Sequence, residues 1–329
     1  METTPDKRIV CIVGPTACHK TELSVQLALK TEGEIVSADS VQVYRGMDIG
    51  SAKPDFSERQ GVLHHLLDCV SIDEADFSVS RYRTLAMRAI DDMHARGRTP
   101  IVVGGSGLYV NALTHPLGFA IPANANVRAR IAAEFDHDPG AAYERLKKLD
   151  SPTAARLHPN DKKRVVRALE VAECAGRPLS SFGVDFHNEA GENAPYEPLL
   201  IGLSMDRAAL YRRIERRVER MFEAGLLEEA RRIYDEGYGM RLPAMQSIGY
   251  RQLFAYFAGD CTLEEARESI QRDTRRFAKR QMTWFRRDGR IRWYDVTNYD
   301  ETADRLIAEL TYLIRGWMKG SQYDQWNNG

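Results

Sequence analysis

The chain has 329 residues, enough for one large domain or for a core with a smaller second unit. With 43% hydrophobic and 28% charged residues it has the composition of an ordinary globular protein. The formal net charge of −1 excludes a uniformly basic or acidic protein, so any binding of nucleic acid must depend on local clusters of charge.

The sequence gives no sign of membrane insertion or of a metal centre built from cysteine and histidine. No apolar run approaches the roughly 20 residues of a membrane span, and the first apolar run is too short for a signal peptide. The five cysteines are scattered, which favours the reducing cytoplasm. The pair His64-His65 has no further ligands at a useful spacing, so we expect packing or hydrogen bonding there.

The first third of the chain alternates between strand and helix patterns. Residues 8–14 form a β-branched apolar run that ends in glycine, and residues 20–30 have apolar positions at helical spacing. Strand patterns return at 33–40 and 99–110, separated by a helix pattern at 77–97. Strands that are apolar throughout and alternate with helices predict an α/β fold, with a parallel sheet covered on both faces.

The character of the chain changes in the middle. From about residue 126 to 176 only helix patterns occur, and Ser151 followed by Pro152 fits an N-cap with proline at the first helical position. A strand pattern returns at 199–205. We therefore predict an α/β core made of residues 1–115 and 196–315, a helical insertion domain over 116–195, and a polar tail over 316–329.

Residues 14–21, GPTACHKT, are similar to the phosphate-binding P-loop, G-x-x-x-x-G-K-[ST], and lie between a strand pattern and a helix pattern. Backbone N–H groups at the helix start can hold a diphosphate, while Lys20 reaches its oxygens and Thr21 offers a hydroxyl to Mg²⁺. His19 replaces the second glycine; histidine tolerates positive φ better than most residues, so we expect a working loop with weakened phosphate binding. A chance match before an ordinary helix is the alternative. The predicted diphosphate-binding residues are Gly14, Pro15, Thr16, Ala17, Cys18, His19, Lys20 and Thr21.

Two other strand patterns end in residues that carry chemistry. Asp39 follows the second strand, and ligands of open parallel sheets bind at the carboxyl ends of the strands, so Asp39 should face the same crevice as Lys20. It could bind Mg²⁺ through a water or act as a general base, unless it is a simple turn aspartate. The strand at 99–103 continues into Gly104-Gly105-Ser106, without the acidic residue that an ATPase often has there. We interpret this as close approach to a leaving diphosphate.

Residues 262–290 form the most strongly charged helix pattern. Thr262 and Glu265 predict a capping box, and residues 267–292 contain ten Lys or Arg against three Asp or Glu. Two other basic segments lie at 207–220 and 162–167. Phosphates of a nucleic acid are the natural counter-charge, with a solvated helix face as the alternative. Seven basic residues with almost no acidic partners are expected on one face: Arg272, Arg275, Arg276, Lys279, Arg280, Arg286 and Arg287.

Together these motifs resemble those of the tRNA dimethylallyltransferases, also called tRNA isopentenyltransferases or IPP transferases. The matching segments are GPTACHKTELS, SADSVQVYRGMDIGSAKP, HHLLD, VVGGSGLYV, RLHPNDKKRVVRALE, SIGYRQ and RRFAKRQMTWFRR, in order over residues 10–290. That family transfers a dimethylallyl group from dimethylallyl diphosphate to N6 of the adenosine 3′ to the anticodon of tRNA, releasing pyrophosphate with the help of Mg²⁺. The resemblance implies the same activity on a P-loop NTPase-like core, in a cytoplasmic monomer with no membrane partner, and an insertion that grips the anticodon stem-loop.

The resemblance also implies roles for individual residues. Asp39 would take the proton from the N6 amine, Ser106 would contact the amine and the phosphate, and Arg217 would stabilise the leaving diphosphate. Mg²⁺ would be bound by Thr21, and by Asp39 through a water. The implied tRNA contacts are Asp39, Ser40, Val41 and Gln42 at the flipped adenine, and Ser106, Arg128, Lys163, Arg164, Val165, Val166, Arg167, Arg251, Arg276, Lys279, Arg280 and Gln281. The chain departs from the family pattern at His19, normally glycine, and at Ser106, normally threonine.

Three other functions stay open at this point. A transferase that acts on free adenine nucleotides would share the diphosphate site, although it needs neither the basic helix nor the insertion. A small-molecule P-loop kinase would transfer phosphate, which the segment VVGGSG supports poorly. An RNA-binding protein whose P-loop is impaired by His19 would bind tRNA without modifying it.

Overall fold

The computed structural model describes residues 7–74, 77–116, 124–182 and 194–320. The chain divides into two compact units, one formed by Met1–His115 with Phe186–Gly329 and the other by Pro116–Asp185. Among the described residues, no helix is long and apolar enough to span a membrane.

The first unit contains a six-stranded sheet in which every described pairing is parallel. The strand order is β3-β2-β4-β1-β5-β6. The central strand β1 is buried along almost its whole length because it has a neighbour on each edge and helices on each face. The strands are β1 Arg8–Val13, β2 Gly33–Ser37, β3 His64–His65, β4 Thr99–Gly104, β5 Glu197–Ser204 and β6 Arg292–Asp295.

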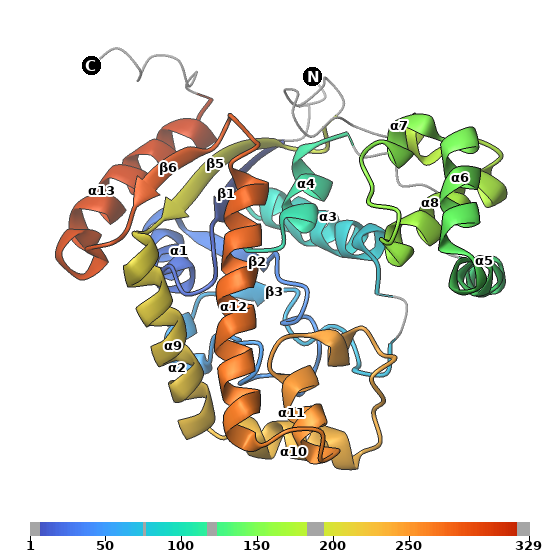
Figure 1. Ribbon diagram of the computed structural model, residues 1–329. Helices are drawn as coiled ribbons and strands as arrows, with labels where there is room; N and C mark the ends of the chain where they lie inside the picture. Colours follow the sequence, from blue (N-terminus) through green and yellow to red (C-terminus); the bar gives the residue numbers. More distant parts are fainter. Residues whose placement is uncertain (1–6, 75–76, 117–123, 183–193, 321–329) are drawn as a thin grey trace. The chain divides into compact units, whose positions relative to one another are not determined.

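Helices cover both faces of this sheet, as Figure 1 shows. On one face α1, Lys20–Thr31, and α13, Tyr299–Met318, contribute Leu23, Leu27 and Leu310 to the first core cluster. On the other face α3, Val79–Ala95, and α4, Gly107–Thr114, contribute Tyr82 and Leu113 to the second cluster. The predicted parallel sheet with two covered faces is therefore confirmed.

A third core cluster joins the segment after β2 to a group of C-terminal helices. Val43 and Met47 from that segment are buried together with Leu226, Tyr250 and Ile270. The longest helix, α12, runs through this region, and its predicted capping box of Thr262 and Glu265 is confirmed. The remaining elements of this unit are α2 Phe56–Arg59, α9 Arg207–Glu223, α10 Leu226–Asp235, the 3-10 helix η2 Ala244–Gln246, α11 Tyr250–Phe257 and α12 Leu263–Phe285.

The second unit is helical throughout its described part, as predicted for this segment. Its core is formed by Ile131, Leu146 and Leu169, with others. The predicted N-cap at Ser151 is wrong, because Asp150 caps this helix by accepting from Thr153 N at 3.1 Å. Aspartate is as good an N-cap as serine, and Pro152 is tolerated in the first turn in either register. The elements are α5 Ala125–His137, α6 Pro139–Leu149, α7 Ser151–Ala154, α8 Lys162–Ala175 and the 3-10 helix η1 Leu179–Phe182.

Some elements of the first unit are absent from the sequence prediction. Strand β3 has two residues and β6 has the mixed sequence RWYD, so neither has a period long enough to recognise. Both strands lie at the edges of the sheet, where tertiary pairing decides their conformation. Helix α13 continues to Met318, so the polar tail predicted from residue 316 begins too early.

Candidate active site

Three loops meet at the carboxyl edge of the sheet because β2, β4 and β1 are consecutive neighbours. The P-loop follows β1, Asp39 follows β2, and Ser106 follows β4. Ser106 N donates to Ala38 O at 3.1 Å, and Ser106 Oγ accepts from Ser40 N at 3.1 Å. The segment that carries Asp39 is thus bonded directly to the loop that carries Ser106.

The P-loop combines several residues of positive φ with a lysine held inside the loop. Gly14 has φ 148°, and a Cβ there would lie 2.6 Å from Leu203 O, so this position requires glycine. Ala17 has φ 65°, and such turns direct successive N–H groups toward one side, where they can bind an anion. Lys20 Nζ donates to Pro15 O at 2.7 Å. Burial lowers the pKa of Lys20, and Asp39 opposes that shift.

His19 takes the left-handed conformation that the missing glycine would take, with φ 58° and ψ 14°, as its residue type predicts. Its side chain is only 5% exposed and stacks on Tyr299 of α13, with ring centroids 4.2 Å apart. His19 Nδ1 also lies 3.0 Å from Glu22 Oε2. The imidazole is therefore packed against the first turn of α1 and against α13.

Asp39, Lys20 and Arg217 lie within electrostatic range of one another. Asp39 Oδ1 accepts from Val41 N at 2.8 Å and from Gln42 N at 3.3 Å. Arg217, on α9, is half-buried; burial lowers the pKa of its guanidinium, and the charge of Asp39 opposes that shift. Within the described residues Arg217 makes no hydrogen bond or ion pair, so its charge is available to an anion.

Two oxygen atoms at this edge suit a magnesium ion. Thr21 Oγ1, in the first turn of α1, and Asp39 Oδ2 make no hydrogen bond with any other described residue. Mg²⁺ prefers oxygen ligands and is commonly held by one or two protein groups together with phosphates and waters. The side chains present therefore fit the expected ion.

Comparison with known proteins identifies the family. The family model described as IPP transferase matches residues 42–288. The chain belongs to the IPP transferase family.

Curated relatives and solved structures match nearly the whole chain. A tRNA dimethylallyltransferase of Alkaliphilus metalliredigens is 44% identical over 313 residues, 94% of this chain and 98% of that protein. One of Geobacter sulfurreducens is 48% identical over 298 residues, 90% of this chain and 94% of that protein.

Among solved structures, the tRNA isopentenylpyrophosphate transferase of Bacillus halodurans has a TM-score of 0.71 at 41% identity and covers 96% of this chain and 98% of its own. A eukaryotic dimethylallyltransferase acting on tRNA has a TM-score of 0.83 at 28% identity, over 97% of this chain and 81% of its own. The predicted P-loop-like fold is thereby confirmed.

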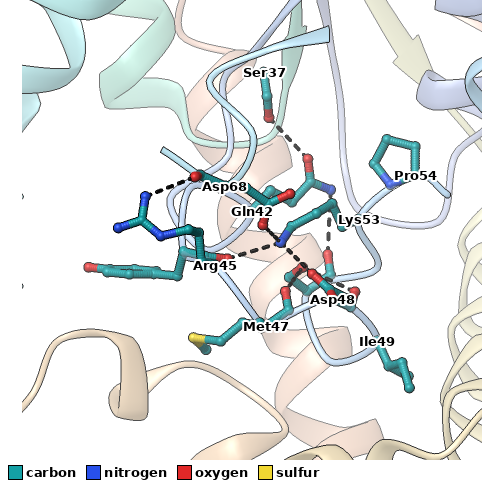
Figure 2. Close-up of polar contacts among 12 residues, drawn as sticks. Ser37, Gln42, Arg45, Met47, Asp48, Ile49, Lys53, Pro54 and Asp68 are labelled. Carbon is teal, nitrogen blue, oxygen red and sulfur yellow. Dashed lines mark hydrogen bonds and ion pairs between the residues drawn. The ribbon is translucent and has the colours of Figure 1, made fainter. Parts of the chain in front are cut away.

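In this IPP transferase a buried lysine holds the segment that follows Asp39 (Figure 2). The Lys53 side chain is 3% exposed, and its three N–H groups donate to Tyr44 O at 2.9 Å, Asp48 Oδ1 at 2.6 Å and Asp68 Oδ1 at 2.5 Å. A buried ammonium is stable only when it is paired in this way. Lys53 therefore joins residues 44–53 to Asp68, in the loop that follows β3.

Gln42, expected to meet the flipped adenine, is also fixed from within the protein. Its Oε1 accepts from Ser37 Oγ at 3.0 Å and its Nε2 donates to Ala52 O at 3.1 Å (Figure 2). Contact between Gln42 and an adenine stays a prediction. The two hydrogen bonds fix the orientation of the Gln42 amide within the protein.

Helix α10 holds residues 48–50, which lie in the middle of this segment. Glu229 accepts hydrogen bonds from the backbone N–H groups of Asp48, Ile49 and Gly50 at 2.8 to 3.0 Å, and from Tyr250 Oη at 2.6 Å. Neither Lys53 nor Glu229 can be recognised from the sequence as a support of the site, because a lysine in a polar loop and a glutamate on a helix ordinarily face solvent.

Helices α12 and α9 support the phosphate loop. Gln281 is 5% exposed; its Oε1 accepts from Thr16 N at 2.9 Å and its Nε2 donates to Gly105 O at 3.1 Å. Arg213 Nε donates to Ala17 O at 2.9 Å. Both hydrogen bonds of the Gln281 side chain are made within the protein, so they give no support to its expected contact with tRNA.

The glycines at the end of β4 and directly after it serve the packing of the protein itself, and their close approach to a leaving diphosphate stays a prediction. A Cβ at Gly104 would lie 2.1 Å from Ala38 O, one at Gly105 2.0 Å from Gln281 Nε2, and one at Gly107 2.1 Å from the indole of Trp284. Close approach of β2 and α12 therefore explains why these positions lack side chains.

The basic face of α12 has more acidic partners than expected. Arg275 pairs with Glu215 at 2.8 Å, and Asp273 pairs with Arg272 at 3.8 Å, with Arg276 at 3.5 Å and with Arg251 of α11. The prediction of almost no partners is wrong for Arg272, Arg275 and Arg276, because Asp273 lies on the same face of α12 and α9 supplies Glu215. The basic residues of α12 and its C-terminal end without an acidic partner in the described part of the chain are Lys279, Arg280, Arg286 and Arg287.

The expected tRNA contacts of the second unit divide into paired and exposed side chains. Arg128 and Arg167 both bond to the fully buried Glu170, at 2.9 and 3.0 Å. Lys163 and Arg164 are exposed, and Arg164 pairs with Asp161 at 2.8 Å. The side chains of Val165 and Val166 are buried in the core of the unit, so direct contact with RNA could involve only their backbone.

Proposed function

We propose that this chain is a tRNA dimethylallyltransferase, which transfers a dimethylallyl group from dimethylallyl diphosphate to N6 of the adenosine 3′ to the anticodon. The observation that carries the proposal is that the P-loop, Asp39 and Ser106 lie together at neighbouring strand ends. Relatives named tRNA dimethylallyltransferase match this chain over nearly their whole length. In this reaction the N6–C1 bond forms, the C1–O bond to the diphosphate breaks, and pyrophosphate leaves.

The diphosphate is held by the P-loop, Gly14 to Thr21. Backbone N–H groups at the start of α1 and the ammonium of Lys20 bind its oxygens, and Arg217 stabilises the negative charge that develops as the C1–O bond breaks. This role suits Arg217 because the residue is half-buried and free of acidic ion-pair partners among the described residues.

Asp39 takes the proton from the N6 amine as it attacks. Its Oδ1 is fixed by two backbone N–H groups, which leaves Oδ2 for the proton. Ser106 Oγ lies beside this segment and can contact the amine and the phosphate. Mg²⁺ held by Thr21 Oγ1, and through a water by Asp39, would neutralise charge on the diphosphate.

The tRNA is bound through its anticodon stem-loop, with the target adenine flipped out of the stack to meet residues 39–42. Charge for its backbone is provided by Lys279 and Arg280 of α12, which have no acidic partner in the described part of the chain, and by the exposed Lys163 and Arg164 of the second unit. We propose that the enzyme acts as a monomer in the cytoplasm, where its five free cysteines stay reduced.

A label-transfer assay tests the proposal. Purified protein with Mg²⁺ and radiolabelled dimethylallyl diphosphate is offered an anticodon stem-loop with adenosine 3′ to the anticodon, and in parallel AMP, ADP and ATP. Label is expected on the stem-loop alone. Label on the free nucleotides would establish a nucleotide transferase instead, and no label on any acceptor would contradict the proposal.

Asp39→Asn is the matched variant in this assay. The asparagine Oδ1 can still accept the two backbone N–H groups that Asp39 binds, so the loop and the melting temperature should be retained. Because the amide cannot take the proton, kcat should fall by about 10² to 10⁴. A variant with native kcat would remove Asp39 from the base role.

A further inference from the structure

The amide of Gln281 joins the two loops that face the diphosphate. It accepts from Thr16 N in the P-loop and donates to Gly105 O in the loop after β4, at 2.9 and 3.1 Å. Thr16 and Gly105 follow neighbouring strands, β1 and β4, and Gln281 comes from α12, 265 residues after Thr16. No other described side chain is hydrogen-bonded to both of these loops.

The surrounding residues are shaped for this bridge. Gly105 has no positive φ, so its lack of a side chain is explained by space: an added Cβ would lie 2.0 Å from Gln281 Nε2. One turn further along α12, Trp284 fits against Gly107 in the same way, at 2.1 Å. Two glycines of the loop after β4 therefore admit two side chains from one face of α12.

We propose that Gln281 is a positioning residue for the transfer reaction, acting on the diphosphate loop instead of contacting tRNA. It holds Thr16 N and Gly105 O at a fixed separation and so orients the N–H groups of the P-loop toward the diphosphate. This inference rests on the proposed function for its substrate, but its geometry does not depend on which acceptor is prenylated.

The same helix carries basic residues that have no acidic partner among the residues that the structure describes. Lys279 and Arg280 precede Gln281 directly and are exposed, while Gln281 is buried. Helix α12 thus has an outer face suited to RNA and an inner face bonded to the diphosphate loop. Loss of Gln281 should therefore weaken binding of the diphosphate without weakening binding of the RNA.

Gln281→Met tests this separation, because methionine has a similar length and makes neither hydrogen bond. Gln271→Met is the matched control: Gln271 lies on the same helix and donates one hydrogen bond, to Glu219 Oε1 at 2.9 Å, away from both loops. Three quantities are measured for each protein: the affinity for pyrophosphate with Mg²⁺ by calorimetry, the affinity for the stem-loop, and KM and kcat of transfer.

Gln281→Met is expected to weaken pyrophosphate binding and to raise KM for dimethylallyl diphosphate by about threefold to tenfold, the usual effect of one or two lost hydrogen bonds. Its stem-loop affinity should stay within about twofold of native, and Gln271→Met should change none of the three quantities. Weakened stem-loop binding with native pyrophosphate binding would overturn the inference and make Gln281 an RNA contact. Native values throughout would overturn it as well.

Gly105→Ala gives the same test if Gln281→Met does not fold, since the added Cβ would displace the Gln281 amide without changing the residue at position 281. It should also weaken pyrophosphate binding and spare the stem-loop; unchanged pyrophosphate binding would count against the bridge. Pyrophosphate binding is measured without transfer. Failure of the native protein to transfer label would therefore contradict the proposed function, while the comparison of variants would still decide the role of Gln281.

Discussion

His19 combines a backbone conformation that favours glycine with a side chain that packs well. For a non-glycine residue the left-handed conformation costs roughly 1 to 2 kcal/mol. The stacking of the imidazole on Tyr299, at 4.2 Å, can return about 0.5 to 1.5 kcal/mol, and the contact with Glu22 adds to it. The two effects nearly cancel, so histidine is tolerated where the motif has glycine.

Two substitutions at this position should therefore differ. His19→Gly removes both the strain and the stacking, so the free energy of unfolding should stay within about 1 kcal/mol of native. His19→Ala keeps the strain and loses the stacking, so its free energy of unfolding should be lower than native by about 1 to 2 kcal/mol. Urea unfolding measures both.

Transfer kinetics of the same variants test the phosphate loop. Because the imidazole lies against α13 and the first turn of α1, KM for dimethylallyl diphosphate should change by less than about twofold in His19→Gly. A tenfold lower KM in this variant would mean that the side chain obstructs the diphosphate, as the sequence motif alone suggests.

At the scale of elements, Glu34 ties together β2, β3 and the end of α3. Its carboxylate accepts from Arg96 Nη2 at 2.8 Å and lies 2.7 Å from His65 Nε2, so the expected hydrogen bonding in the His64-His65 pair is confirmed for His65. The hydrogen bonds of Arg96, and then of His65, lower the pKa of Glu34 from 4.5 to about 2 against the effect of burial.

The stability of the protein should depend on pH through this group. A carboxyl whose pKa is lower in the folded state stabilises fully above its unfolded pKa, here 4.5, and loses that effect as the pH falls toward 2. Glu34→Gln should therefore lower the free energy of unfolding by about 3 kcal/mol at pH 7, and the difference should shrink steadily between pH 4.5 and 2. A difference independent of pH, in urea unfolding at several pH values, would rule out this ion pair as its cause.

Helix α12 supports a prediction about salt. Lys279 and Arg280 have no acidic partner in the described ranges, so each should release about one counterion on binding tRNA. The variant Lys279→Ala with Arg280→Ala should reduce the slope of log affinity against log salt by about 1.5 to 2. Arg267→Ala is the control, because Arg267 already pairs with Glu219 at 2.8 Å. Equal slopes for both variants, measured by fluorescence anisotropy, would contradict the assignment.

Local patterns identify the elements that are buried and regular. Strand β1, helix α1 and the N-terminal cap of α12 can each be recognised from a short run of consecutive residues, and all three are predicted correctly. The supports of the site are different. The roles of Gln281, Arg213 and Tyr299 depend on contacts with residues about 200 or more positions away, which no local period encodes.

At the scale of the whole molecule, the predicted diphosphate-binding residues lie in one unit, and the predicted tRNA contacts are shared by both units. All the predicted diphosphate-binding residues, with Asp39, Ser106 and Arg217, belong to the first unit, whereas Arg128 and Lys163 to Arg167 belong to the second. The second unit is inserted between α4 and β5, so the chain completes the sheet only after it has formed the helices α5 to α8.

That order has a consequence for synthesis of the protein. The apolar strand β1 is paired with β4 on one edge and with β5 on the other, and β5 ends only at Ser204. A nascent chain that has reached residue 115 therefore presents a bare, apolar strand edge, the kind of surface that aggregates and that chaperones protect. The phosphate loop gains its last hydrogen bond later still, when Gln281 emerges. Chains that end before β5 should thus be insoluble as well as inactive, because that edge of β1 stays unpaired.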